Sequence, residues 1–198
     1  MNKLFLIISF FILIGCQEGV ENTPIVDNNS IPELKMSIPL SELILNSKEV
    51  DNSKINKDFS WESEDNISIQ YEKSLNQFEK RKVSIELSKY DDETISREKF
   101  HEDKVKWFSK MIPDNVNGGM KKNNFYSKRI PIEKIGDSSY CYDFVSPTVV
   151  VLYKNYIIES HVTKVYVYEN LSESNSSTLN KSIEIIKKQI NKINEKGL

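Results

Sequence analysis

The region from Tyr140 to Val167 constrains the fold most, because it is dense in β-branched and aromatic residues, which favour strands. We interpret three runs in it, 140–144, 149–153 and 156–167, as strands. Lys154-Asn155, between the last two runs, is typical of a two-residue hairpin turn. The region therefore predicts an antiparallel meander.

Upstream of the meander, apolar and polar residues alternate in the way that half-buried strands require. The apolar positions are Ile67, Ile69 and Tyr71 in a first segment and Val83, Ile85 and Leu87 in a second. A third alternation, at Ile130, Ile132 and Ile135, ends at Gly136-Asp137, which is a turn signal. We expect the first two segments to pair as antiparallel strands.

Two long amphipathic helices are also predicted. Asp91-Asp92 precedes a helix over 93–111 as an N-cap, and Ser176 or Ser177 caps a terminal helix. The expected apolar positions are Phe100, Val105, Phe108 and Met111 in the first helix and Leu179, Ile183, Ile186, Ile190 and Ile193 in the second. The terminal helix is too short for a convincing coiled coil, so packing against the sheet is favoured. A shorter helical segment is expected at 39–45.

These elements predict one α+β domain over residues 32–198, with a mainly antiparallel sheet packed by two long helices. One domain is the default for a chain of 198 residues.

The N-terminus carries an apolar run, residues 4–14, which follows Lys3 and ends in Leu13-Ile14-Gly15-Cys16. At about 1.5 Å per residue, this run covers roughly 16 Å of a hydrocarbon core about 30 Å thick, so it is too short to span a membrane. A basic start, an apolar segment and a small residue before the cleavage point are typical of an export signal.

The sequence Leu13-Ile14-Gly15-Cys16 resembles the lipobox of bacterial lipoproteins. The resemblance implies that residues 1–15 are a signal peptide cleaved between Gly15 and Cys16. It also implies that the Cys16 sulfur carries a diacylglycerol and that the new N-terminus is usually acylated. The mature chain would then be held on a membrane of the bacterial cell envelope by its lipid, with residues 16–31 as a flexible tether. Because Gln17 replaces the Asp that signals inner-membrane retention, the periplasmic side of the outer membrane is favoured in a Gram-negative cell.

The order of the predicted elements resembles uncharacterised bacterial lipoproteins with PsbP- or Mog1-like α/β/α sandwiches. The resemblance covers roughly residues 58–195 and is carried by Ile135-Gly136-Asp137, Val149-Val150-Val151 and the terminal helix. None of these is a functional residue, so the resemblance transfers no activity.

Composition and motifs argue against several classes of function. Lys and Arg number 27 against 29 Asp and Glu, so there is no basic excess for nucleic acid. Gly118-Gly119 lacks the context of a phosphate-binding loop. A zinc helix beginning at His101 would need a second His where Val105 stands. We therefore expect no metal and no cofactor other than the covalent lipid on Cys16.

Candidate chemistry centres on the lone thiol that remains after lipidation, Cys141. We predict that it is a buried small hydrophobe. The alternative is a catalytic thiol with His101 or His161 as its base. His161 shares a strand face with Glu159 and Thr163, and we expect that face to be exposed.

Aromatic residues offer a second candidate. Tyr140 with Tyr142, and Tyr166 with Tyr168, are two apart on strands and form paired rings that are either core or a recognition surface. The sequence thus predicts a membrane-anchored, non-enzymatic binding module with no catalytic residue, whose partner is a protein or an envelope component. The alternatives are an immunity or inhibitor lipoprotein directed against a toxin, and a small envelope enzyme that uses a Cys141–His pair.

Overall fold

The computed structural model describes residues 38–198 except 114–115, 117, 144–145, 167–170 and 174–175. The predicted signal peptide, the lipidated Cys16 and the tether at 16–31 lie outside the described residues, as does Tyr168.

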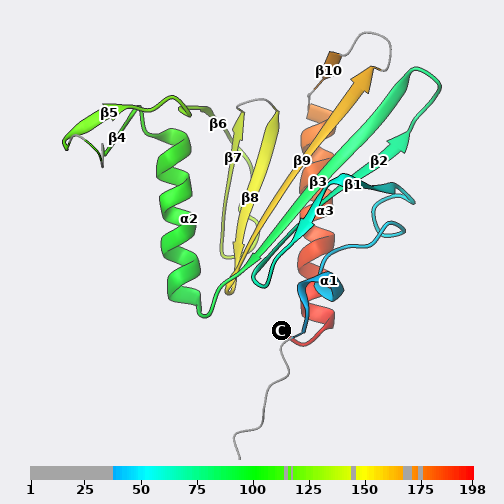
Figure 1. Ribbon diagram of the computed structural model, residues 1–198, viewed down its shortest axis with the longest axis horizontal. Helices are drawn as coiled ribbons and strands as arrows, with labels where there is room; N and C mark the ends of the chain where they lie inside the picture. Colours follow the sequence, from blue (N-terminus) through cyan, green and yellow to red (C-terminus); the bar gives the residue numbers. More distant parts are fainter. Residues whose placement is uncertain (1–37, 114–115, 117, 144–145, 167–170, 174–175) are drawn as a thin grey trace, which may run out of the picture. The chain divides into compact units, whose positions relative to one another are not determined.

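A single antiparallel sheet of eight strands forms the centre of the fold (Figure 1). Its strands are β1 (Lys54–Glu62), β2 (Asn66–Ser74), β3 (Glu79–Lys89), β6 (Lys128–Ile130), β7 (Ser138–Asp143), β8 (Pro147–Tyr153), β9 (Tyr156–Tyr166) and β10 (Leu171–Glu173). Seven of them follow the order β1-β2-β3-β9-β8-β7-β6, and β10 pairs with the end of β9. The class predicted from the sequence, α+β with a mainly antiparallel sheet, is confirmed.

The helices are α1 (Leu40–Leu43), α2 (Glu93–Phe108) and α3 (Ser176–Glu195), and a separate small hairpin pairs β4 (Met111–Pro113) with β5 (Met120–Lys122). In the view of Figure 1, α3 lies behind the sheet and α2 stands beside β7 and β8. Successive strand residues point to opposite faces. The residues that pack with α3, such as Val149 and Val151, therefore alternate with Val150 and Leu152, which belong to a second cluster with Phe100 of α2.

The turn from β8 to β9 forms where the sequence predicts it. Lys154 takes a left-handed φ of 53°, and its backbone N–H donates to the Asp137 carboxylate at 2.6 Å. Gly136, at φ 62°, brings the preceding turn so close that a Cβ there would lie 2.7 Å from the Leu152 carbonyl oxygen. The predicted Gly136-Asp137 turn is thus braced against the hairpin.

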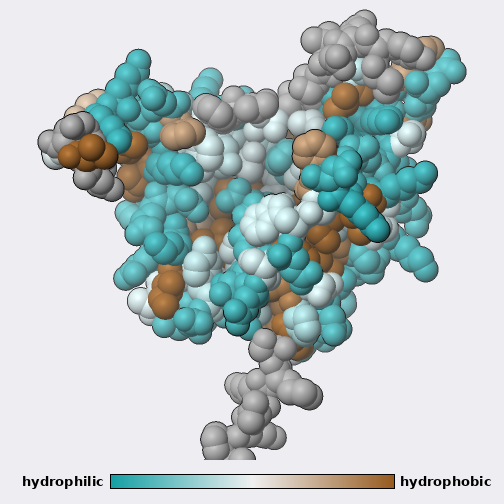
Figure 2. All heavy atoms as spheres, viewed as in Figure 1, coloured by the Kyte–Doolittle hydropathy of each residue, from teal (hydrophilic) through white to brown (hydrophobic). Residues whose placement is uncertain are grey.

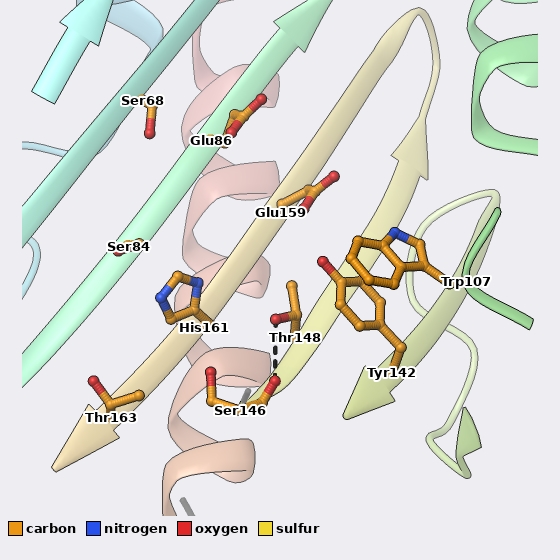
Figure 3. A pocket seen from close by; sticks show the side chains of 10 residues that line it. All are labelled: Ser68, Ser84, Glu86, Trp107, Tyr142, Ser146, Thr148, Glu159, His161 and Thr163. Atoms are coloured by element: carbon orange, nitrogen blue, oxygen red, sulfur yellow. Dashed lines mark hydrogen bonds between the residues drawn. The ribbon is translucent and has the colours of Figure 1, made fainter. Parts of the chain in front are cut away.

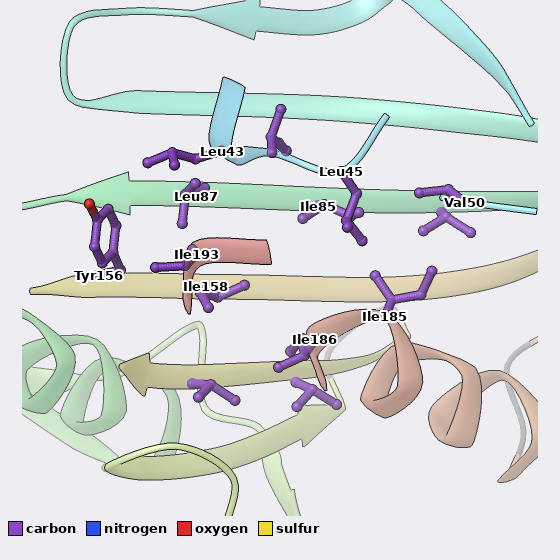
Figure 4. Packing of buried hydrophobic residues seen from close by; sticks show 14 of the residues in the cluster. Leu43, Leu45, Val50, Ile85, Leu87, Tyr156, Ile158, Ile185, Ile186 and Ile193 are labelled. Carbon is purple, nitrogen blue, oxygen red and sulfur yellow. The ribbon is translucent and has the colours of Figure 1, made fainter. Parts of the chain in front are cut away.

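The main core lies between the sheet and α3 (Figure 4). Ile185, Ile186 and Ile193 of α3 are completely buried against strand residues such as Ile85 and Ile158. Of the predicted apolar face, Leu179, Ile183 and Ile190 are only partly buried. The buried face of α3 instead includes two polar side chains, Ser182 and Gln189, which are both completely buried.

Gln189 fastens the N-terminal end of the described chain to α3. Its Nε2 donates to the Leu43 carbonyl at 2.7 Å, and its Oε1 accepts from the Leu45 N–H at 3.0 Å. The Tyr71 hydroxyl donates to the Leu45 carbonyl, and Lys192 Nζ donates to the Ile44 carbonyl at 2.8 Å. The buried amide thus uses both its nitrogen and its oxygen, as buried polar side chains normally do.

Two predicted elements differ from the structure. The helix capped by Asp92, whose carboxylate accepts from the Thr94 and Ile95 N–H groups, ends at Phe108 rather than 111. Val105 and Met111, expected on its buried face, are 37% and 46% exposed. The third alternation is a strand only over Lys128–Ile130. Conversely, β1 was not predicted, because it is an edge strand with no buried position.

Candidate functional site

One face of the sheet is covered by α2 only in part. Over β7, β8 and the start of β9 the face is apolar and packs against Phe100, Trp107 and Phe108 of α2. Farther along β9, and across β3 and β2, the same face becomes polar. Figure 2 shows the front of the molecule, where hydrophilic side chains predominate over α2 and hydrophobic ones gather on the β4–β5 hairpin.

Strand register brings the polar side chains of this face together. Glu86 of β3 lies directly opposite Glu159 of β9 and is paired on its other side with Ser68 of β2. In the next row, His161 of β9 lies between Ser84 of β3 and Thr148 of β8. Cross-strand neighbours of this kind have Cβ atoms about 4.5–5.5 Å apart.

These rows line a hollow of about 370 Å³, here called the open-face pocket (Figure 3). The residues that line it are mainly hydroxyl and carboxyl side chains: Ser68, Ser84, Glu86, Trp107, Tyr142, Ser146, Thr148, Glu159, His161 and Thr163. The helix α2 packs on the apolar part of this face only. Trp107 lies at the edge of that contact, and the polar part of the face beyond it is left uncovered.

Glu159 is the most perturbed group in the pocket. Burial, together with the neighbouring carboxyl groups of Glu86 and Asp103, raises the pKa of its carboxyl to about 8, and Lys106 opposes this rise. Glu86 accepts a hydrogen bond from Asn66 Nδ2 at 3.0 Å, whereas Glu159 has no hydrogen bond or ion pair among the residues that the structure describes. At neutral pH the Glu159 carboxyl is therefore mostly protonated.

His161 lies beside this carboxyl pair on the same strand face. Burial lowers the pKa of its imidazole, so the ring is neutral at pH 7. A neutral imidazole offers one donor and one acceptor. The prediction that His161 shares a face with Glu159 and Thr163 is confirmed, but the face is a partly buried pocket wall rather than an exposed surface.

Tyr140 and Tyr142, the first pair proposed as a recognition surface, are not exposed. Tyr140 is completely buried and Tyr142 nearly so, because the aromatic side chains of α2 cover them. The Tyr142 ring stacks on Trp107 with centroids 3.9 Å apart, and Tyr140 contacts Phe100 at 5.0 Å. Tyr142 thereby forms a wall of the pocket, and Tyr140 belongs to the core.

Of the second predicted pair, Tyr166 and Tyr168, only Tyr166 is among the described residues. Tyr166 lies at the end of β9, where Lys164 Nζ sits 5.1 Å from its ring centroid, and Tyr168 lies outside the described part of the chain. Among the residues that the structure describes, the large aromatic side chains that are exposed are others: Phe59, Trp61, Phe78, Phe125 and Tyr126.

Cys141 lies on the opposite face of the sheet from the pocket. It is completely buried in the core with α3, and burial, with the Asp143 carboxylate, raises the pKa of its thiol to about 12. His161 points into the open-face pocket and His101 is exposed on α2. The structure therefore does not bring Cys141 together with either histidine, because His161 and the helix α2 that carries His101 lie on the face of the sheet opposite the thiol.

No group of three or more His, Cys, Asp or Glu side chains suited to a metal ion occurs in the described part of the chain. No helix within the same residues is long and apolar enough to cross a membrane.

The two carboxyl residues that line the pocket, Glu86 and Glu159, were not singled out from the sequence as candidate site residues. A signal was available, since Ser84 and Glu86 alternate on β3 as Glu159, His161 and Thr163 do on β9. Two polar faces on neighbouring central strands indicate a hollow or a solvent-facing surface, but only the register identifies Glu86 as the partner of Glu159.

In comparisons with known proteins, no family model, no curated protein and no solved structure matches this chain.

Proposed function

We propose that this protein is a non-enzymatic binding module, anchored by lipid in the bacterial cell envelope, whose ligand or partner group enters the open-face pocket. The observation that carries the proposal is the partly buried carboxyl of Glu159 in that pocket, which has no hydrogen bond or ion pair to any residue in the described part of the chain. The volume of the open-face pocket, about 370 Å³, falls in the range of small-molecule sites, roughly 300–1,000 Å³.

The polar groups of the pocket support binding as its role. Glu159 and His161 have no hydrogen-bond partner within the described residues, and both are partly exposed in the pocket. Their polar atoms are therefore available to a ligand that enters it.

We infer the location from the sequence around Cys16. A diacylglycerol on that sulfur, with an acylated N-terminus, would hold the protein on the membrane, and the periplasmic side of the outer membrane is favoured if the cell is Gram-negative. The finer fold assignment, a PsbP- or Mog1-like sandwich packed by two long helices, is part of the same proposal. It rests on the order of the elements.

Anchoring is tested by Cys16→Ala in the full-length chain. The variant should lose lipid labelling, stay in the aqueous phase of a detergent partition or accumulate as precursor, and differ in mass from the processed wild type. Gln17→Ala serves as the matched control and should be lipidated normally. Identical partition and mass for wild type and Cys16→Ala would overturn the anchoring proposal.

Binding at the pocket is tested by NMR of the full-length protein in nanodiscs, with a library of amines, sugars, organic acids and amino acids. At least one compound class should shift the His161 imidazole signals while leaving those of His101 in place. The shift should weaken in Thr148→Val, which removes a pocket hydroxyl, and persist in Glu102→Gln on the exposed side of α2. A library that leaves His161 unmoved throughout contradicts the proposed function.

A second candidate, an inhibitor or immunity lipoprotein, is favoured by the edge of the sheet. The edge strand β1 exposes Ile55, Phe59 and Trp61 by 43%, 62% and 52%. Exposed aromatic side chains suit protein interfaces. The double change Phe59→Ser with Trp61→Ser separates the candidates, because it should abolish binding of a protein at the edge and leave small-molecule shifts at His161 unchanged.

A further inference from the structure

We propose that the open-face pocket binds its ligand through a positively charged ammonium or guanidinium group placed between the carboxyl groups of Glu86 and Glu159. The inference rests on the proposed binding function and adds the chemical class of the ligand.

The composition of the pocket wall is the first argument. It contains two carboxyl groups and five hydroxyl groups from Ser and Thr, and no Lys or Arg is among its described residues. An ammonium group has only donors, so it matches a wall rich in acceptor oxygens. An anionic ligand would meet two carboxyl groups and no cation.

The opposition of Glu86 and Glu159 across the strand pair is the second argument. Glu86 and Glu159 lie directly opposite each other, and like charges in such positions destabilise a sheet. Burying a carboxyl group without a hydrogen-bond partner also costs free energy, because the group loses its hydration. A cation between the two would favour the ionised form of both carboxyl groups and so make two favourable contacts. Glu86 is already oriented by Asn66, whereas Glu159 is left for the ligand.

The lysines nearby have other partners. Lys106 lies 5.3 Å and 5.6 Å from the ring centroids of Trp107 and Phe125. Lys82, in a neighbouring row, pairs with Glu72 at 3.4 Å. Lys164 pairs with Glu79 at 2.8 Å. None of these three lines the pocket, so the position between the carboxyl groups stays open to a cation from outside the chain.

Because the Glu159 carboxyl is protonated near neutral pH, we expect binding of a cation to release a proton. The groups that face this carboxyl are Glu86 on β3, Asp103 and Lys106 on α2, Tyr142 on β7 and His161 on β9 itself, while β8 contributes Thr148 and no titratable group. Near neutral pH the carboxyl holds its proton, and an arriving cation favours the carboxylate. The O–H bond of Glu159 breaks, its proton passes to the buffer, and the carboxylate that remains pairs with the ligand.

The test uses 1,5-diaminopentane against 1,5-pentanediol, which match in length and differ in charge. Calorimetry on the full-length protein in nanodiscs at pH 7, in two buffers of different ionisation enthalpy, should detect the diamine with release of up to one proton. Glu159→Gln and Glu86→Gln should each weaken the diamine at least tenfold, and Glu159→Gln should abolish the proton release. Glu102→Gln, an exposed carboxylate on α2, should bind as wild type does.

Two further probes identify the source of the cation. A Gly-Lys-Gly peptide and its Nε-acetylated form distinguish a protein side chain from a free amine. Binding of the peptide, lost on acetylation, assigns the pocket to a lysine of a partner protein, whereas binding of the diamine alone assigns it to a small molecule.

Equal affinity for the diol and the diamine, or no response to the diamine and to the peptide, overturns the cation inference. The proposed function then still stands if another compound class moves the His161 signals, so the two failures are distinguishable.

Discussion

Glu159 and Ser160 are neighbours in the chain but serve opposite sides of the sheet. Glu159 faces the open-face pocket, while Ser160 is buried in the core on the side of α3, where its hydroxyl has no partner in the described structure. His161 returns to the pocket side. Because side chains alternate along a strand, the central strand β9 builds the core and the candidate site with consecutive residues.

Replacing Glu159 with Gln should stabilise the protein at neutral and alkaline pH. Burial raises the pKa of this carboxyl from 4.5 to about 8, so between these values the folded state keeps a proton that the unfolded state loses. Stability due to Glu159 therefore falls as pH rises from about 4.5 to 8. Denaturant melts should give similar stability for wild type and Glu159→Gln at pH 4, and a gain on the order of a few kcal/mol for the variant above pH 8.

The comparison must be made between variants, because His161 acts in the opposite direction. Burial lowers the pKa of its imidazole, so its contribution to stability rises as pH increases toward its unfolded value near 6.5. Glu102→Gln, at an exposed position of α2, should follow the wild-type curve. A Glu159→Gln difference that is the same at pH 4 and pH 8 would show that the carboxyl titrates normally.

The thiol of Cys141 should be almost inert in the folded protein. Burial raises the pKa of this thiol to about 12, and the side chain is completely buried in the core cluster that includes residues of α3. In the Cys16→Ala variant, where Cys141 is the single thiol, iodoacetamide at pH 8 should react only at the rate of unfolding. The unfolded chain should react quickly. Rapid labelling of the folded protein below pH 7 would contradict the buried assignment.

At the scale of elements, α3 is the main stabilising helix. Ile186→Ala should cost about 2–5 kcal/mol, because it opens a cavity at a completely buried position facing the sheet. Asn180→Ala on the exposed side of the same helix should stay within about 0.5 kcal/mol. Denaturant midpoints at constant slope measure both. An unchanged midpoint for Ile186→Ala would place this face of α3 in solvent.

Elements that combine a clear period with a buried face were predicted well from the sequence. This holds for β2, β3 and α3, where apolar positions repeat every two residues or at helical spacing. Strands β8 and β9 were predicted instead from their density of β-branched and aromatic residues. The edge strand β1 was missed because it has no buried position, so no alternation marks it. In α2 the packing is carried by Phe100 in the middle of the helix and by Trp107 and Phe108 at its end, and the position of Val105 on the helix leaves it exposed.

The candidate site could be predicted from the sequence only in part, namely the part that β9 contributes. Alternation on β9 places Glu159, His161 and Thr163 on one face, which the sequence reveals without a structure. That Glu86 stands opposite Glu159 depends on the register of β3 with β9, and the register follows from packing on the other face of the sheet. The end of α2 at Trp107 and Phe108, which leaves the hollow uncovered, is likewise a tertiary feature.

At the scale of the whole molecule, Gln189 joins segments that are 146 residues apart in the chain. Gln189→Ala should cost about 1–3 kcal/mol, because it leaves the Leu43 carbonyl and the Leu45 N–H buried without partners. Hydrogen exchange at the Leu45 amide should accelerate in the variant. Asn191→Ala, an exposed amide on the same helix, should change neither quantity. Unaltered protection at Leu45 would mean that other contacts hold this segment.

The hydrogen bonds that Gln189, Tyr71 and Lys192 make to the backbone of residues 43–45 have a mechanical consequence. Any pull on the chain from its N-terminal side enters the described fold at residue 38 and reaches Leu43, Ile44 and Leu45 before it reaches the sheet. There Gln189, Tyr71 and Lys192 hold the backbone, so the load passes at once to α3 and β2. We therefore expect the two ends of the fold to yield together under tension, as a single force step, instead of unravelling from the N-terminus.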